Sequence, residues 1–353
     1  PASPGGAAWA TGAGISSMSS SRLLLAVGAA VMSSPMARAE HDLSWALAEA
    51  GGKQPIIVFV HALWCPPCNE QHREIWETED GSTLLKDAVF LDIDAETDAG
   101  YAVVRRYGVV GYPTTLVLDP QGEELDRVEG YPGRDLFLRA MADARLAKAG
   151  LKALEAAAEL KPDDPDVALA LGQARLVRGD LRGEAGLRTL MAKGGAVGAN
   201  AGRILGRYFL RVKRQGGDGR TIFRELLTQY AGTEDAEEFR LWAAQGLVLQ
   251  GDRAAGLALV EAGVTPGVPE GLITKAWFMV RFGYSAAETR TAIEAAIAAN
   301  PAAPGPRYLA AELALNQGDR VRAELEIRAA LGINPTKALY RNFLEKRLGK
   351  SLK

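Results

Sequence analysis

The chain has 353 residues, of which 48% are hydrophobic and 24% charged, a composition typical of a globular protein too long for one ordinary domain. Its net charge of −2 argues against a general nucleic-acid binder, and we expect no nucleic-acid partner. The charge is uneven: +2 over residues 1–39, −10 over 40–148 and +6 over 149–353. We therefore predict an upstream segment, an acidic domain over 40–148 and a basic domain over 149–353.

The first segment has the three parts of a secretory signal peptide. A short basic start follows Met18, an apolar run spans residues 23–32, and small residues stand at Ala37 and Ala39. The apolar run is too short to cross a bilayer, which takes about 20 residues. We expect cleavage near Ala39 and a periplasmic or secreted protein without stable membrane insertion; the alternative is a buried helix. Residues 1–17 are interpreted as upstream sequence or disorder.

Strand and helix patterns alternate between the predicted cleavage point and residue 148. The patterns predict, in chain order, a helix over 42–50, a strand over 56–60, a helix ending near 78, a strand over 88–93, a helix over 99–107, strands over 114–118 and 125–128, and a helix over 134–148. With short connections, this order predicts an α/β domain with a compact central sheet covered by helices.

Beyond residue 148 the strand patterns stop, and helical sequence is interrupted by glycine at regular intervals. The interruptions fall at Gly179, Gly217, Gly251, Gly283 and Gly318, with spacings of 38, 34, 32 and 35 residues. An interval near 34 residues is typical of stacked helical hairpins of the tetratricopeptide kind. We therefore predict an all-α, tetratricopeptide-like solenoid over 149–353; the alternative is an irregular helical bundle.

Small residues support the hairpin interpretation. If Gly318 is the turn between two helices, Ala311 and Ala323 fall where those helices must approach closely. The unit around Gly251 repeats the pattern with Ala244 and Gly256. Stacked hairpins form an extended concave surface, so we expect the repeats to bind a client protein.

The only cysteines, Cys65 and Cys68, form a C-x-x-C motif between a predicted strand and a predicted helix. This placement is typical of redox chemistry rather than of a structural disulfide. At the helix N-terminus, unpaired amides and the helix dipole stabilise a thiolate on Cys65, and Cys68 is close enough to resolve a mixed disulfide. We expect Cys65 to be the exposed thiol with the lower pKa and Cys68 to be buried.

Two separate motifs resemble those of the thioredoxin family. Trp64–Cys68 (WCPPC) resembles the thioredoxin active-site signature, and residues 107–114 (YGVVGYPT) resemble the stretch that carries a cis-proline. Residues 90–94 are similar to the strand between these motifs, and 119–123 to the following hairpin. The resemblance covers about 42–148 and is strongest to the catalytic domain of periplasmic membrane-linked disulfide reductases and to small secreted thioredoxin-like domains.

The resemblance implies that the protein is a thiol-disulfide oxidoreductase with no cofactor. Cys65 would be the nucleophile, Cys68 the resolving thiol, and Trp64 a shield over the pair. Pro113 would follow a cis peptide bond next to the Cys65 sulfur.

The same resemblance implies where a substrate binds. Tyr112 would pair its backbone with an extended substrate segment, and Pro66 would contact the substrate between the cysteines. The partners implied are a client protein with a disulfide and, because reductants in an oxidising compartment need electrons, a membrane thiol reductase as donor. Pro66 and Pro67 separate the cysteines without a histidine, which favours a reductant or a redox-neutral exchanger over a strong oxidant.

The sequence departs from typical thioredoxins at two positions. Phe59 and Phe90 stand where that family carries a buried aspartate and a lysine, so the general base is missing. His61 is a candidate acid/base that would replace it, because histidine is the side chain that ordinarily exchanges a proton near neutral pH. The alternative is a neutral His61 that only packs.

Two further interpretations remain open. His61, Cys65, Cys68 and His72 together offer enough ligands for Zn or Cu(I) delivery, although we expect no metal site because the strand-to-helix scaffold should turn the histidines away from the thiols. A redox-switched chaperone or protein-binding scaffold is the alternative to catalysis. The repeats contain no cysteine or histidine, so we expect them to select the client without contributing to redox chemistry.

Overall fold

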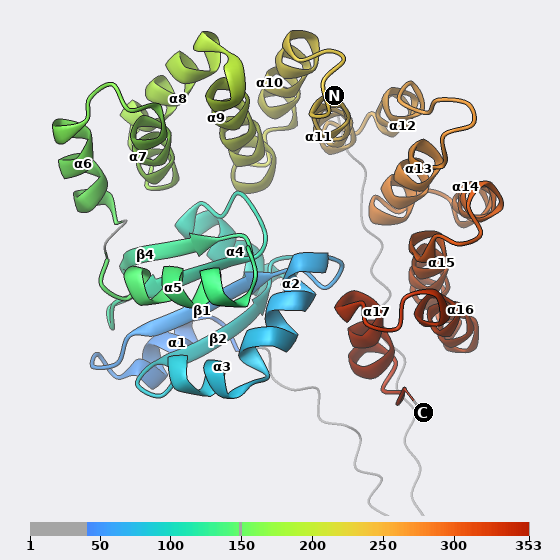
Figure 1. The fold of residues 1–353 in the computed structure, drawn as a ribbon, viewed down its shortest axis with the longest axis horizontal. Helices are drawn as coiled ribbons and strands as arrows, with labels where there is room; N and C mark the ends of the chain where they lie inside the picture. Colours follow the sequence, from blue (N-terminus) through green and yellow to red (C-terminus); the bar gives the residue numbers. More distant parts are fainter. Residues whose placement is uncertain (1–40, 148–149, 353) are drawn as a thin grey trace, which may run out of the picture. The chain divides into compact units, whose positions relative to one another are not determined.

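The computed structural model describes residues 41–147 and 150–352 (Figure 1). The predicted signal peptide and its cleavage near Ala39 lie outside the described residues. The N-terminal part of the described chain is a four-stranded mixed sheet in the order β2-β1-β3-β4. Its strands are β1 (Ile56–His61), β2 (Val89–Asp94), β3 (Thr114–Leu118) and β4 (Glu124–Glu129). β1 runs parallel to β2 and antiparallel to β3, and β4 is antiparallel to β3.

Helices cover both faces of this sheet because its central strands are apolar on both sides. Ile56, Val58 and Val60 of β1 pack against α1 (Leu43–Ala50) and α4 (Asp98–Tyr107), while Ile57 packs against α5 (Arg134–Ala144). On the α5 side lie α2 (Pro66–Gln71), the π-helical turn η1 (His72–Trp76) and α3 (Glu79–Leu84). All four strands were predicted from the sequence.

The helices of this domain differ from the prediction in three places. The helix after Cys65 continues to Trp76 but changes from α to π geometry at His72, where α2 ends and η1 begins. The sequence prediction omits α3, a short helix whose EDGSTL sequence has no apolar residues repeated at the spacing of a helix. The last helix ends at Ala144, earlier than predicted, and a turn follows it.

The remaining described residues form helical hairpins. Their helices are α6 (Leu151–Leu160), α7 (Pro165–Val177), α8 (Leu181–Lys193), α9 (Gly195–Arg207), η2 (Tyr208–Val212), α10 (Gly216–Gln229), α11 (Ala236–Leu249), α12 (Arg253–Glu261), α13 (Pro269–Arg281), α14 (Ala286–Ala299), α15 (Pro304–Asn316), α16 (Arg320–Ile333), α17 (Ala338–Asn342) and η3 (Phe343–Arg347). Together with the N-terminal domain this confirms the predicted fold class. No helix in the described part of the chain is long and apolar enough to span a membrane.

Four of the five predicted glycine turns are confirmed. Gly179, Gly251, Gly283 and Gly318 each separate the two helices of a hairpin, with φ between 63° and 86°. Glycine suits these turns because it adopts positive φ without a side-chain penalty. The prediction for Gly217 is wrong, since this residue lies in the first turn of α10, and Arg214 takes the positive φ instead.

The predicted small residues are buried where hairpin helices meet. Ala244, Ala311 and Ala323 have no exposed surface, and a Cβ on Gly256 would lie 3.1 Å from the Ala244 carbonyl oxygen. These positions therefore allow the close approach that the sequence predicts.

The hairpins also contact the sheet domain. A Cβ on Gly108, after α4, would lie 2.5 Å from the Val177 Cβ at the end of α7, so the chain there approaches too closely for any larger residue. Further along, η2 packs on α4. Close to the C-terminus, α17 packs on α2 (Figure 1). The last of these contacts brings the C-terminal helices to the C-x-x-C motif.

Candidate active site

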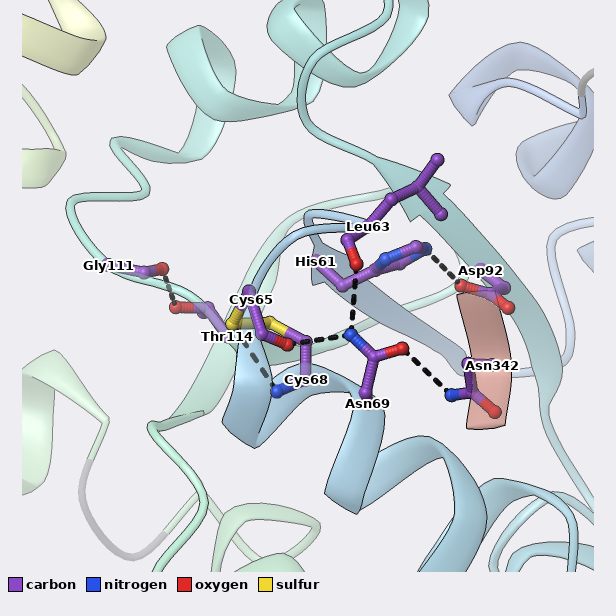
Figure 2. Close-up of a disulfide and its surroundings, with 9 residues drawn as sticks. All are labelled: His61, Leu63, Cys65, Cys68, Asn69, Asp92, Gly111, Thr114 and Asn342. Atoms are coloured by element: carbon purple, nitrogen blue, oxygen red, sulfur yellow. Dashed lines mark hydrogen bonds and ion pairs between the residues drawn. A yellow bond between two sulfur atoms is a disulfide. The ribbon is translucent and has the colours of Figure 1, made fainter. Parts of the chain in front are cut away.

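The two cysteines lie where β1 leads into α2, and their sulfur atoms form a disulfide (Figure 2). Cys65 is the N-cap of α2, and its Sγ accepts a hydrogen bond of 3.3 Å from the backbone N–H of Cys68. Pro66 occupies the first turn, where its missing N–H costs nothing because that amide has no helical partner. Local sequence thus fixes both the helix start and the spacing of the sulfur atoms.

Both cysteines are buried, which corrects the prediction of an exposed Cys65. Cys65 is 4% exposed and Cys68 2%. They share an apolar cluster with Phe59 of β1, and the partly buried rings of Trp64 and Tyr112 pack on that cluster. The sequence could not predict that Cys65 is buried, because some of the residues that pack against the Trp64 and Tyr112 rings belong to the hairpin domain.

The predicted cis peptide bond between Tyr112 and Pro113 is confirmed. Thr114, at the start of β3, donates its hydroxyl to the Gly111 carbonyl at 2.9 Å across this turn (Figure 2). The backbone N–H and C=O of Tyr112 form no hydrogen bond within the described residues. An edge with a free donor and acceptor is able to pair with an extended peptide.

Trp64 lies between the sheet domain and the hairpins. Its ring contacts the Tyr112 ring edge-on, with a centroid separation of 6.4 Å, and the Trp277 ring of α13 at 6.1 Å. The guanidinium of Arg281 lies 4.9 Å from its centroid. Trp64 Nε1 is buried and has no hydrogen-bond partner in the described part of the chain.

His61 and His72 converge on Asp92 rather than on the thiols. His61 Nε2 lies 2.9 Å from Asp92 Oδ1, and His72 Nε2 lies 3.1 Å from Asp92 Oδ2. Burial tends to raise the pKa of Asp92, but the hydrogen bonds from both histidines outweigh it and hold that pKa far below the usual range. Asp92 is on β2, opposite Phe59 of β1, and the sequence analysis did not identify it as a site residue.

Phe59 occupies the position at which typical thioredoxins carry the buried aspartate. Phe59 is fully buried, and its ring centroid lies 5.6 Å from that of Trp76, which in turn lies 4.9 Å from that of Phe90. Phe59 also stacks on His61 at 5.1 Å. The two phenylalanines noticed in the sequence are therefore part of one aromatic layer.

Asn69 is a site residue that the sequence analysis missed. Its Nδ2 donates to the Leu63 carbonyl at 3.0 Å and to the Cys65 carbonyl at 2.8 Å, which ties the loop to the first turn of α2 (Figure 2). Its Oδ1 accepts a hydrogen bond of 2.8 Å from Asn342 of α17, and Asn342 Oδ1 accepts one from Arg73. An asparagine directly after the motif was visible in the sequence, but a partner 273 residues away was not.

Comparisons with known proteins agree with this geometry. A family profile described as a thioredoxin-like domain matches residues 42–145. The thiol:disulfide interchange protein DsbD of Cronobacter sakazakii is 36% identical over 100 residues, which are 27% of this chain and 17% of that protein. The protein of the same name from Yersinia enterocolitica is 34% identical over 102 residues, covering 28% and 18% of the two chains.

The similarity is confined to one part of each chain. DsbD of Escherichia coli K12 is 32% identical over 100 residues, again 27% of this chain and 18% of that protein. The chain therefore spans less than a fifth of the length of these relatives, and the similarity lies in the domain that holds the disulfide. Residues 42–145 belong to the thioredoxin-like family as a domain homologous to part of the thiol:disulfide interchange protein DsbD, followed in this chain by helical hairpins.

Proposed function

We propose that this protein is a thiol-disulfide oxidoreductase that reduces or exchanges disulfides of client proteins. The observation that carries the proposal is the Cys65–Cys68 disulfide at the start of α2, in a domain homologous to proteins named for thiol:disulfide interchange. The assignment of residues 40–148 as the catalytic domain and 149–353 as a tetratricopeptide-like, client-binding domain belongs to this proposal.

The proposed reaction begins with both cysteines reduced. The Cys65 thiolate attacks one sulfur of the client disulfide, forms a mixed disulfide and releases the other client sulfur as a thiolate, which takes up a proton. The Cys68 thiol loses its proton and attacks Cys65 Sγ, forming the intramolecular disulfide and releasing the second client thiolate. Two electrons pass to the client, and a dithiol donor must return them; we propose a membrane thiol reductase.

The residues around the disulfide have distinct roles in this proposal. Trp64 shields the sulfur atoms, Pro113 shapes the loop beside them, and Tyr112 offers its backbone to the client. Pro66 contacts the client between the cysteines. His61 would act as the acid/base group, and its bond to Asp92 supports a role in holding a proton near the site rather than direct contact with sulfur.

The place of action and the direction of electron flow are also proposals. The signal-peptide pattern that ends at Ala39 supports export to the periplasm or secretion. Pro66 and Pro67 between the cysteines support a reductant or exchanger over an oxidant, because neither side chain donates a hydrogen bond to a thiolate.

Burial of the disulfide favours one alternative, a redox-switched binding protein. With Cys65 only 4% exposed, a client disulfide cannot reach the sulfur unless Trp64 or Tyr112 moves. A switch protein would use that disulfide to change its own conformation and would not turn over.

Reduction of insulin with dithiothreitol as donor distinguishes the two functions. We expect the protein to accelerate insulin reduction at catalytic concentration and Cys65→Ser to lose that acceleration. Cys68→Ser should instead accumulate a mixed disulfide at Cys65, which identifies the client when the variant is produced in an exporting cell. If the disulfide is reduced but neither insulin nor an exported client is turned over, the switch is the better description.

A further inference from the structure

A cavity of about 400 Å³ lies between the sheet domain and the hairpins, and its lining includes Trp64, the residue before Cys65. Trp64 and Tyr112, which pack on the cysteine cluster, form the wall on the sheet side. The hairpin side contributes Arg211 of η2, Arg214, Trp242 of α11 and Trp277 of α13. We refer to the space between these six residues as the arginine–tryptophan cavity. Its volume is in the range of sites that bind small organic ligands or short peptide segments.

The cavity carries an excess of positive charge. Its two carboxylates are already engaged, because Glu96 pairs with Arg281, and Glu238 pairs with arginines at positions 203 and 207. Within the described residues, Arg211 and Arg214 form no ion pair with any carboxylate. Two guanidinium groups therefore face the cavity without a matching anion.

Arg211 is held deep in the cavity by aromatic rings and one hydrogen bond. Its guanidinium lies 4.5 Å from the Tyr112 ring centroid and 4.6 Å from that of Trp242, and Nη1 donates to the Val110 carbonyl at 2.9 Å. Burial lowers the pKa of Arg211 to about 10, so the group remains cationic at neutral pH. Nearer the solvent, the Arg214 guanidinium lies 3.7 Å from the Tyr101 ring centroid.

We propose that the arginine–tryptophan cavity binds an extended segment of the client that carries a carboxylate close to its disulfide cysteine. The segment would pair with the free backbone edge of Tyr112, pack its apolar atoms on Trp242 and Trp277, and place its carboxylate on Arg211 and Arg214. This inference rests on the proposed function and adds a substrate class to it: disulfides flanked by acidic residues.

The position of the cavity links the binding of a segment to access to Cys65. Trp64 both covers the cysteines and lines the cavity, so a segment that enters must contact the residue that restricts access to Cys65. The Trp64 N–H is buried without a partner among the described residues, and an acceptor on a bound segment would satisfy it.

Three peptides that differ at one position test the proposal. Each contains alanine in place of cysteine, so that no exchange occurs, and each has Glu, Gln or Lys beside that alanine. Fluorescence anisotropy with the oxidised full-length protein should show the Glu peptide binding about tenfold more tightly than the Gln peptide, because a charge-assisted hydrogen bond exceeds a neutral one by about 1.4 kcal/mol. The Lys peptide should bind most weakly.

Variants locate the preference in the cavity. Arg214→Gln should lower the ratio of Glu to Gln affinities severalfold, because one of the two guanidinium partners is lost, and Arg211→Lys, which keeps the charge, should retain most of the preference. Lys213→Gln is the matched control: it removes one positive charge between the two arginines, from an exposed residue that does not line the cavity, and should leave the ratio unchanged.

Several results would overturn the proposal. One is equal affinity for the three peptides, and another is a preference for Glu that Arg214→Gln leaves unchanged. A third is displacement of the labelled Glu peptide by glutathione disulfide as effectively as by the unlabelled Glu peptide, which would indicate a small-molecule site. The reduction of bis(2-hydroxyethyl) disulfide, a neutral small substrate, is measured in parallel. If that activity is present while the preference for acidic peptides is absent, the oxidoreductase function stands and only this inference fails; if the activity is absent, the proposed function fails regardless of peptide binding.

Discussion

The two sulfur atoms have different surroundings although both are covered. Both cysteines belong to the Phe59 cluster, but Cys65 caps α2 and accepts a hydrogen bond from the N–H of Cys68, whereas Cys68 lies within the helix. A helix N-terminus stabilises a thiolate, and an apolar environment destabilises one. The asymmetry therefore favours Cys65 as the nucleophile without requiring it to be exposed.

Alkylation rates measured against pH check this assignment. In the reduced protein, Cys65 of the Cys68→Ser variant should titrate with a pKa below the reference of about 8.5, and Cys68 of the Cys65→Ser variant above it. Burial should make both rates slower than those of the same variants unfolded in urea, which serve as the control. A faster reaction at Cys68, or a free-cysteine pKa at Cys65, would reverse the proposed roles.

Asp92 provides a pH-dependent contribution to stability. Its folded pKa is depressed by the hydrogen bonds from His61 and His72, which outweigh the opposing effect of burial. A depressed carboxyl pKa stabilises the folded state fully above the unfolded value of about 3.9 and loses that effect as the pH falls toward the lower folded value. Asp92→Asn should therefore destabilise the protein at pH 7 but not at low pH.

The size of this effect is limited because the Asp92 side chain is about one-third exposed, 36%, so solvent screens its pairs. We expect Asp92→Asn to lower the free energy of unfolding by on the order of 1 kcal/mol at pH 7, and the difference to shrink below about pH 4. Urea unfolding at several pH values measures it. Asp87→Asn, at an exposed turn, is the control and should have little effect at any pH. A deficit of equal size at pH 3 and pH 7 would contradict the assignment.

How much of the site the sequence predicts depends on how local each interaction is. Cys65, Cys68 and the cis bond before Pro113 were predictable because each belongs to a short continuous motif. The partner of Asn69 was not, since it is 273 residues away in the chain. Burial of Cys65 was missed for a related reason: it depends on rings whose positions are set partly by the hairpins.

At the scale of elements, the hairpin turns show what a glycine pattern specifies. Gly318 has φ +79°, and no atom outside its immediate chain neighbours would lie within 4 Å of an added Cβ, so only backbone conformation requires glycine there. Gly217, by contrast, lies inside a helix, because α10 begins at Gly216, and Arg214 adopts φ 51° in place of a glycine. The periodicity therefore predicted the hairpins better than the individual turn residues.

A pair of Gly→Ala substitutions distinguishes a glycine that is required by its positive φ from a glycine inside a helix. Gly318→Ala should destabilise the protein by about 1–2 kcal/mol, because alanine pays for the left-handed conformation. Gly186→Ala, inside α8 with open space around its Cβ, should stabilise it by up to about 1 kcal/mol through helix propensity. Urea unfolding of both full-length variants gives the two signs. Equal effects in the same direction would mean that the turn is not conformationally constrained.

At the scale of the whole described chain, opposite charges join the hairpins to the sheet domain. The basic partner belongs to the hairpins in four ion pairs of the described residues: Arg178–Glu124, Arg281–Glu96, Lys337–Glu70 and Lys346–Glu77. In a fifth, Arg73–Glu345, the acidic partner belongs to the hairpins. This agrees with the net charges of −10 and +6 found in the sequence. The hairpins also reach the surroundings of the disulfide, because Arg281 covers Trp64, and Asn342 bonds to Asn69.

Added salt should therefore increase the access of reductants to the Cys65–Cys68 disulfide. Exposed and partly exposed ion pairs weaken as the Debye length falls from about 10 Å at 0.1 M to about 3 Å at 1 M salt. If the contact of α13 with Trp64 restricts access to Cys65, then raising the salt concentration should speed reduction of the disulfide by dithiothreitol. Arg281→Gln, which removes both the pair with Glu96 and the contact with the Trp64 ring, should be faster than wild type at low salt and respond less to added salt.

Lys275→Gln is the matched control for this experiment. It removes a positive charge from the same helix, but its partner is Glu261 within the hairpins, so its rate and salt response should equal those of the wild type. The rate is followed through the fluorescence of Trp64 and its neighbours or by trapping free thiols at set times. If all three proteins respond to salt alike, the hairpins do not control access to Cys65, and the cover over the disulfide must come from Tyr112 and the loop of the sheet domain itself.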